Sequence, residues 1–505
     1  MNKIIVVSLG MIISISSLTA SDLLNGRSFL QPRSQGQNSA RQLSGWNRYL
    51  VEPGQCFYGS FQATAEYSHS YRTKRLAEYF FNQDTLIVSG SQNPARSPGE
   101  ILADYFGLST TFQSFTTLKP KIRNGILDLD WFFGYKDWYM FVFLPLAWSR
   151  TNFELCEVNA QPGGETYPAN YMAPGVIPVP AQSFTQAVAG GITWGGNTQG
   201  LLFGKIGCPE SRSGLADVHL AFGYNVVNNE CGYAGFNLQL VAPTGNRSTA
   251  EYLLEPMIGN GRHWEFGAGF LGEVLIWEKD GNKRIDFLAQ LRMTHLFASQ
   301  QVRSFDLCLN GFGSRYILAK DFSGNAYNGE FFPLINKTTL ACNVHNTLQF
   351  DMLLLFAFTF HNIGFDIGYE GWLRSHEKIS LCQEFPANTY ALKGIQNAVG
   401  NITQSTATLN GNLLLDQALY ADPFSPVFIS PNELDLNSAA NPLSYTNKIF
   451  ANLNYEWPCH AAYWAPFIGI GGEVEFESLR PRCDIRPNQN SVSQYGIWIK
   501  TGFGF

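Results

Sequence analysis

The sequence predicts an all-β fold, a transmembrane antiparallel β-barrel of about 14 strands, with roughly 12–16 as the range. Three observations lead to this prediction. Aromatic residues make up 14% of the 505 residues, charged residues make up only 15%, and there are 48 glycines. Long stretches alternate apolar and polar residues, as strands do when one face meets lipid and the other meets water. The connections between these stretches alternate between long and short.

The N-terminal 20 residues have the pattern of a secretory signal peptide. Lys3 precedes an apolar run from Ile4 to Ile15, and small residues lead to a cleavage position after Ala20. A membrane anchor is the alternative, but the apolar run is short for a span. Residues 21–55 are polar and are predicted to form a periplasmic lead or a plug, and residues 56–505 are predicted to form the barrel.

Hairpins with alternating residues follow along the chain. Three are clear: 218–226 with 236–240, 264–276 with 285–293, and 350–360 with 365–373. The turn of the second contains Asp-Gly, which favours a tight hairpin. In the third, pairing of Phe360 with Phe365 would place Asp351 opposite Arg374 on the polar face. These strands exceed the roughly 5–6 residues usual in soluble sheets, which favours a membrane barrel over a soluble sandwich.

Tryptophans and loop lengths support the same fold. Trp138, Trp148, Trp264, Trp277, Trp457 and Trp464 stand near strand ends, as the aromatic borders of a membrane belt require. Counted back from Phe505, the long connections are 478–493, 377–445, 298–345, 243–262 and 149–214. The short ones are 458–462, 361–364, 278–283, 227–231 and 136–137. Membrane barrels have long extracellular loops and short periplasmic turns. Further strands near 57–67, 77–88 and 108–118 complete the predicted number.

The last strand, "YGIWIKTGFGF", resembles the C-terminal signature of bacterial outer-membrane β-barrel proteins. The matching residues are Phe505, Phe503, Ile499, Ile497 and Tyr495, and Thr501 departs from the pattern. The resemblance implies a location in the bacterial cell outer membrane, recognition by the barrel-assembly machinery, and closure of the last strand against the first. A weaker similarity is "APTG" at 242–245, which resembles a segment of some outer-membrane channels for hydrophobic compounds.

The polar faces predict a lumen with an excess of acidic residues. The candidate lumen-lining residues are Asp217, Glu273, Asp286, Arg292, Asp351, Asp366, Glu370, Arg374, Glu473 and Glu475. Carboxylates around a hydrated pore favour cations. We therefore expect a porin-like channel for passive diffusion of small hydrophilic solutes, with a weak cation preference. The alternatives are a surface-exposed structural or adhesive outer-membrane protein and a channel for hydrophobic compounds, the latter favoured if residues 21–55 fill the lumen.

Other functions find little support in the sequence. It contains no G-x-S-x-G, H-E-x-x-H or P-loop motif, so no enzyme activity, cofactor or metal is expected. The net charge of -6 gives no indication of nucleic-acid binding. The expected partners are membrane lipid, the assembly machinery, small solutes and, in a homo-oligomer, further copies of the chain.

Nine cysteines suit an oxidising compartment. With sidedness assigned, three disulfides are topologically feasible: Cys156 with Cys208, Cys308 with Cys342, and Cys382 with Cys483. Free thiols are the alternative.

Overall fold

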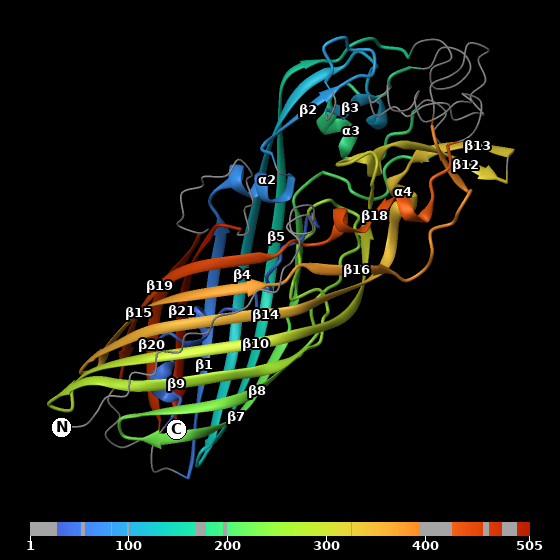
Figure 1. The fold of residues 1–505 in the computed structure, drawn as a ribbon. Coiled ribbons are helices and arrows are strands. Elements are labelled where there is room, and N and C mark those ends of the chain that lie inside the picture. Colours follow the sequence, from blue (N-terminus) through green and yellow to red (C-terminus); the bar gives the residue numbers. More distant parts are fainter. Residues whose placement is uncertain are drawn as a thin grey trace.

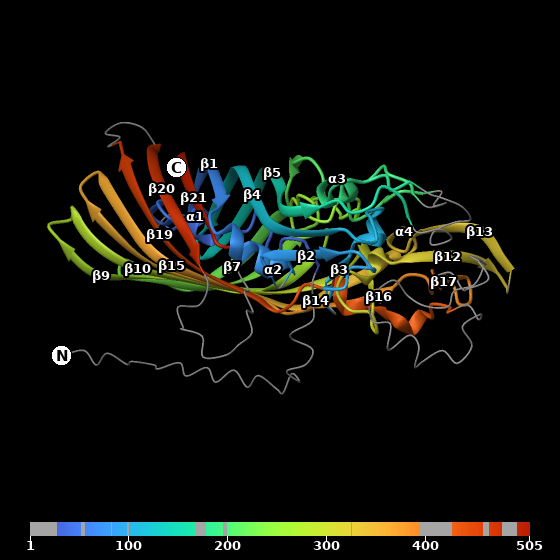
Figure 2. The same cartoon turned by 90° about the horizontal axis from the view of Figure 1, so that it is seen from above.

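Twelve strands close into an antiparallel barrel in the computed structural model (Figure 1, Figure 2). The structure describes residues 28–51, 56–81, 83–97, 100–167, 178–194, 199–324, 326–393, 427–457, 464–476 and 492–505, so the predicted signal peptide lies outside it. The barrel strands are β1 (Phe57–Ser70), β4 (Gln113–Tyr135), β5 (Trp138–Gln161), β7 (Val218–Asn229), β8 (Gly232–Ala242), β9 (Glu265–Lys279), β10 (Lys283–Ser304), β14 (Thr339–Phe360), β15 (Ile363–Arg374), β19 (Ser444–Glu456), β20 (Ala465–Phe476) and β21 (Gln494–Gly504).

The barrel closes where the last strand pairs with the first. In the β1–β21 register, Phe61 lies opposite Phe503, and Gly59 and Phe505 exchange two backbone hydrogen bonds of 2.8 Å. This is the pairing that the resemblance implies. A closed sheet leaves no strand edge unpaired, which a membrane interior requires.

The strand number is at the lower end of the predicted range because two expected strands are not part of the barrel wall as separate elements. Of the separate strand expected near 108–118, residues 113–118 form the start of the 23-residue β4. The segment 77–88 instead holds the end of helix α2 (Thr73–Phe81) and the short strand β2 (Thr85–Ser89), which lies beyond the barrel.

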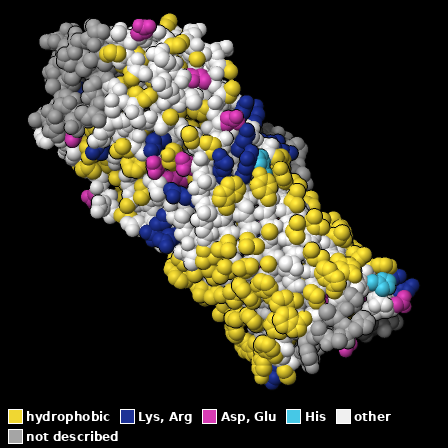
Figure 3. Space-filling view, turned by 180° about the vertical axis from the view of Figure 1, so that it is seen from behind, with side chains coloured by type: hydrophobic (Ala, Val, Ile, Leu, Met, Phe, Trp, Pro, Cys, Tyr) yellow, Lys and Arg dark blue, Asp and Glu magenta, His cyan; other side chains and the backbone are white. Residues whose placement is uncertain are grey.

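Burial alternates along each strand in the sense expected for a membrane barrel. On β8, Phe236 and Leu238 are 63% and 58% exposed, whereas the intervening Asn237 and Gln239 are buried. Figure 3 shows the resulting apolar belt on one face of the barrel. An exposed apolar surface of this extent identifies contact with lipid. Exposed tryptophans stand at both borders of the belt, at Trp138, Trp277, Trp457 and Trp464 on one side and at Trp148 and Trp264 on the other.

The connections have the predicted asymmetry. Tight turns join β4 to β5, β7 to β8, β9 to β10 and β14 to β15, and in the β9–β10 turn Asp280 and Gly281 have positive φ of 58° and 66°. Long connections at the opposite end build an outer bundle beyond the membrane (Figure 1). No helix in the described part of the chain is long and apolar enough to cross a membrane.

The outer bundle contains short elements around one apolar core. Besides α2 and β2, its strands are β3 (Ile101–Leu102), β11 (Asp306–Leu307), β12 (Leu318–Ser323), β13 (Ala326–Pro333), β16 (Glu377–Leu381), β17 (Tyr390–Leu392) and β18 (Leu434–Asp435). Its helices are α3 (Phe184–Val188), α4 (Ile335–Thr338) and the 3-10 turns η2 (Ala103–Phe106), η3 (Ser314–Tyr316), η4 (Pro431–Glu433) and η5 (Leu436–Ala439). The largely exposed β6 (Glu210–Leu215) pairs with β5 at the outer border of the belt. β2, β3, β6 and β16 extend the barrel sheet outward.

Two lysines are buried in the outer bundle. Lys320 and Lys393 are each 2% exposed. Burial lowers the pKa of Lys320 to about 7, and the nearby Lys393 charge lowers it further. Burial also lowers the pKa of Lys393 to about 8, against an opposing effect of the Asp104 carboxylate. The outer bundle thus contains groups that titrate near neutral pH.

The cysteines do not pair as predicted. Cys156, Cys208 and Cys308 are exposed free thiols, Cys342 is a buried free thiol on β14, and Cys382 is also free. The predicted bridges Cys156–Cys208 and Cys308–Cys342 are therefore wrong. Two cysteines in the same loop lie on the same side of the membrane, but this does not bring their side chains to bonding distance. Cys483 lies outside the described residues.

Candidate functional site: the barrel lumen and its inner segment

Residues 28–51, here called the inner segment, run through the inside of the barrel. The segment contains helix α1 (Ser39–Leu43) and the 3-10 turn η1 (Asn47–Tyr49), and α1 lies within the ring of strands in Figure 2. The Asn38 side chain caps α1 by accepting a hydrogen bond from Arg41 N at 3.1 Å. After the helix, Gly45 has φ of +75°, a conformation that favours glycine and lets the chain turn.

The inner segment is basic, and the wall that surrounds it is acidic. Residues 28–51 contain three arginines and no acidic residue. Each arginine reaches carboxylates on different strands. Arg33 pairs with Asp351 at 3.3 Å and with Glu370, and Arg48 pairs with Asp366 at 3.1 Å.

The third arginine, Arg41, is the most enclosed. Its side chain is 1% exposed and pairs with Glu66 at 2.5 Å and with Asp128 at 2.6 Å, so it joins β1 to β4 through the segment. Lys500 on β21 donates to the carbonyl oxygens of Arg41, at 2.7 Å, and Ser44. The end of α1 is therefore held from three strands of the wall.

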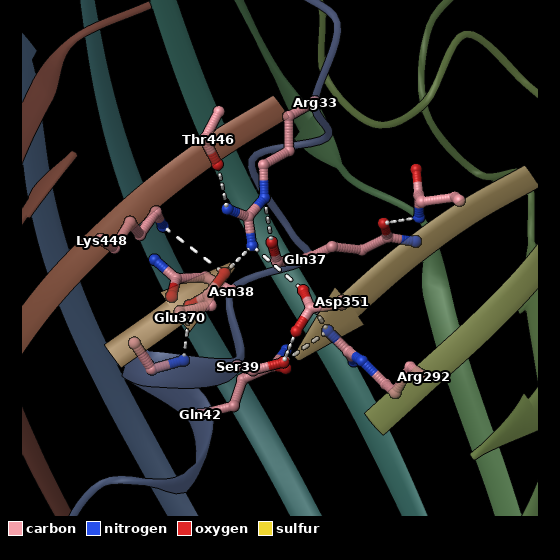
Figure 4. A network of polar contacts seen from close by, with 12 residues as sticks. Arg33, Gln37, Asn38, Ser39, Gln42, Arg292, Asp351, Glu370, Thr446 and Lys448 are labelled. Carbon is pink, nitrogen blue, oxygen red and sulfur yellow. Dashed lines mark hydrogen bonds and ion pairs between the residues drawn. The ribbon is translucent and has the colours of Figure 1, made fainter. Parts of the chain in front are cut away.

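A second group of contacts surrounds the start of α1 (Figure 4). Asp351 accepts from Ser39 Oγ at 2.9 Å and pairs with Arg292 at 3.3 Å. The Ala40 N–H donates to Glu370 at 2.9 Å. A half-satisfied polar network in a low-dielectric lumen would be costly, so these mutual contacts fix one position of the segment.

The predicted lumen-lining residues occupy several places rather than one ring. Asp351, Glu370, Arg292 and Glu473 come together around residues 33–40, where Glu473 pairs with Lys448 at 2.8 Å and accepts from Asn38. The remaining six contact other parts of the molecule. Asp366 pairs with Arg48, Arg374 donates to the Pro32 carbonyl oxygen, and Glu475 accepts from Gln494. Asp217 accepts from Ser34 and Asn260, and Glu273 and Asp286 both pair with Arg284 near the short turns. All are buried except the half-buried Glu273.

One predicted contact on the lumen face is wrong. Phe360 pairs with Ile363 across a two-residue turn at His361 and Asn362, so Asp351 lies opposite Trp372 and not opposite Arg374. The predicted turn had four residues, and the tighter observed turn moves the register by two residues.

The lumen wall is not polar throughout. Apolar side chains from most of the strands face inward and form what we call the inner apolar cluster: Phe132, Tyr139, Phe141, Phe143, Ala221, Tyr233, Leu271, Leu288, Leu353, Leu355, Ala357, Phe450, Phe467 and Trp498. The inner segment covers it with Ala40, Leu43, Trp46 and Leu50. The Trp46 ring meets Phe141 edge-on at 5.8 Å, and Tyr49 stacks on Phe467 at 4.6 Å.

The outer end of the inner segment is also apolar. Phe29 packs against Phe81 at 5.0 Å and against Phe312 at 6.5 Å, and Phe312 remains 45% exposed. A cavity of about 40 Å³ lies beside it, lined among others by Leu253 and Val302. Apolar surface therefore occurs at both ends of the segment, with the charged network between them.

The sequence left the role of this segment open between a periplasmic lead and a plug. The arginines Arg33, Arg41 and Arg48 were not among the candidate residues. A signal was present: a stretch with arginines and no acidic residue precedes a barrel whose inward positions are acidic. The inward Leu353 and Leu355 were also missed, because they interrupt the alternation on a strand that is apolar on both faces.

Comparisons with known proteins leave the family open. No protein-family model and no curated protein matches the chain. Among solved structures, an outer-membrane channel from Pseudomonas putida F1 is similar at 10% identity and a TM-score of 0.36, over 90% of this chain and 100% of that one. The Pseudomonas putida toluene transporter TodX has 6% identity and a TM-score of 0.31, with 96% of each chain covered. A Pseudomonas aeruginosa FadL homologue has 7% identity and a TM-score of 0.28, over 89% of this chain and 90% of that one.

Likenesses this low carry no conclusion about activity. The closed barrel, its apolar belt and the tryptophans at both borders are this chain's own features. They make it a β-barrel protein of the bacterial outer membrane.

Proposed function

We propose that the chain is an outer-membrane channel for hydrophobic compounds that the inner segment holds closed. The observation that carries this proposal is the inner apolar cluster. A pore for hydrophilic solutes is lined by polar side chains, because a hydrated solute gains nothing from an apolar wall. Here Leu288, Leu353 and Leu355 face inward and are fully buried.

The position of the inner segment supports the same proposal. Leu43, Trp46 and Leu50 rest on the cluster, so a compound that replaced them would find an apolar surface already formed. Burial of each such side chain stabilises the closed position by about 1.5–3 kcal/mol. A general porin is not supported, since the cavity between the segment and the wall at Arg41 and Glu66 is only about 20 Å³, room for about one water molecule.

The outer end offers a surface where an apolar compound would first bind. Phe29, Phe81 and Phe312 form an aromatic group there, and Leu309, three residues before Phe312 in the chain, is 73% exposed. We propose that compounds bind here from outside, pass the cavity next to Phe29, and reach the inner apolar cluster when the segment moves.

The test is uptake by cells whose outer leaflet is lipopolysaccharide, which slows unassisted passage of apolar compounds. Expression of the chain should raise uptake of a radiolabelled monoaromatic or long-chain alkyl compound, while liposomes containing the purified chain should not swell in small sugars. Leu288→Gln with Leu355→Gln, a cross-strand pair in the cluster, should reduce uptake several-fold.

Thr294→Gln, an inward position on β10 away from the cluster, is the matched control and should leave uptake unchanged. Each variant is checked for folding by its shift on a gel with and without boiling. Equal uptake by the double variant and the wild type, or rapid sugar-driven swelling, would contradict the proposal.

A further inference from the structure

A row of basic side chains lies on the lipid-facing side of β1, β4 and β5, immediately beyond the outer border of the apolar belt. In the strand register, Arg123 on β4 lies opposite Arg150 on β5 and opposite His69 on β1. Two residues closer to the belt, the corresponding row is Tyr67, Gly125 and Trp148. An aromatic row is thus followed directly by a basic row.

The belt on β5 has the height of a membrane. From Trp138 at the inner border to Trp148 at the outer border the strand advances by about 34 Å, at about 3.4 Å per residue. A tilt of about 40° reduces this to about 26 Å along the barrel axis, close to the ~25 Å apolar band of outer-membrane barrels. Arg150 is two residues farther along, so it lies at the level of the lipid headgroups.

The two arginines have no acidic partner in the part of the chain that the structure describes. Arg123 and Arg150 are both exposed. Opposed residues in an antiparallel pair have their Cα atoms about 4.5–5.5 Å apart, and like charges in this position are unfavourable. The one acidic residue near them on this face, Glu154, pairs with Lys121 at 2.5 Å. Figure 3 shows Lys and Arg side chains gathered at this border of the belt.

We propose that Arg123 and Arg150 bind the phosphate groups of a phosphorylated glycolipid in the outer leaflet. Two guanidinium groups side by side can donate paired hydrogen bonds to one phosphate, and the phosphate relieves their mutual repulsion. The position favours a lipid over free phosphate, because the acyl chains of the same molecule would lie on the apolar surface of Leu127, Leu146 and Trp148 directly below. Lys119, also exposed, adds positive charge on the same face of β4, four residues farther out than Arg123.

The experiment measures binding of lipid A, a bis-phosphorylated glycolipid, to the detergent-purified full chain by native mass spectrometry. The double variant Arg123→Gln with Arg150→Gln should bind it about tenfold or more weakly, because its charge-assisted hydrogen bonds are lost. Lipid A from which the phosphates have been removed should bind the wild type as weakly. Inorganic phosphate at equal concentration should not displace lipid A.

The matched control is Lys378→Gln with Arg262→Gln, which removes the same charge from exposed positions at the same end of the barrel. It should retain wild-type binding. Wild-type affinity in the Arg123/Arg150 variant, equal loss in the control, or displacement by inorganic phosphate would each overturn the proposal. Should the double variant fail to shift on an unboiled gel, the comparison is made with Arg150→Gln alone.

Discussion

Replacing Arg41 with Met is expected to release the inner segment from the wall. The guanidinium is 1% exposed, and its loss leaves the carboxylates of Glu66 and Asp128, 2% and 1% exposed, without their cation. Removal of one partner from a buried ionic group costs about 3–5 kcal/mol, mostly through the charges left behind. A tenfold change in an equilibrium constant corresponds to about 1.4 kcal/mol, so the ratio of docked to undocked segment should fall by a factor of roughly 10² to 10³·⁵.

Planar bilayer recordings measure this shift. The wild type should open rarely, whereas Arg41→Met should show frequent, long openings. The triple variant with Glu66→Gln and Asp128→Asn should close again in part, because a neutral group is much less costly to bury than an unpaired charge. An open probability of Arg41→Met equal to that of the wild type, in a preparation that shifts normally on an unboiled gel, would refute the role of Arg41 in holding the segment against the wall.

The remaining predictions concern other parts of the chain. Gly45→Ala should also increase openings, because alanine at φ of +75° costs about 1–2 kcal/mol and its Cβ would collide with the wall. The outer bundle should gain stability as pH rises from 7 to 9: the lowered pKa values of Lys320 and Lys393 make the unfolded state bind more protons in this range, and Lys320 alone contributes about 2 kcal/mol. Limited proteolysis across this range should show the slope, and Lys320→Met should reduce it. A membrane-impermeant maleimide should label Cys308 on intact cells and leave the buried Cys342 unreacted, and peptide mapping should find no bridge between them.

The barrel could be predicted because its physics is local to each strand. A strand such as β8 meets lipid on one face and the lumen on the other, so its sequence alternates with period two regardless of its partners. The long and short connections are equally readable from spacing. Register is different, since it depends on the turn. The longer turn predicted after Phe360 placed Asp351 opposite Arg374, whereas the observed turn places it opposite Trp372.

The inner segment could not be predicted in the same way because nothing in it is periodic. Its structure follows from contacts with strands more than 300 residues away, as between Arg33 and Glu370 or Arg48 and Asp366. Only charge connected the two, a basic segment before an acidic wall. Leu353 and Leu355 were missed for a related reason: β14 is apolar on both faces, and a two-faced apolar strand gives no alternation from which an inward apolar surface could be recognised.

The same contacts that hold the segment also set what an open lumen would present. While the segment is docked, Glu66, Asp128 and Asp366 are paired with its arginines. If the segment leaves as we propose, those carboxylates and the inner apolar cluster would become accessible together. In the proposed channel, a cation preference and an affinity for apolar compounds are therefore not alternatives. Both would belong to the open state, because the docked segment pairs with these acids and covers the leucines.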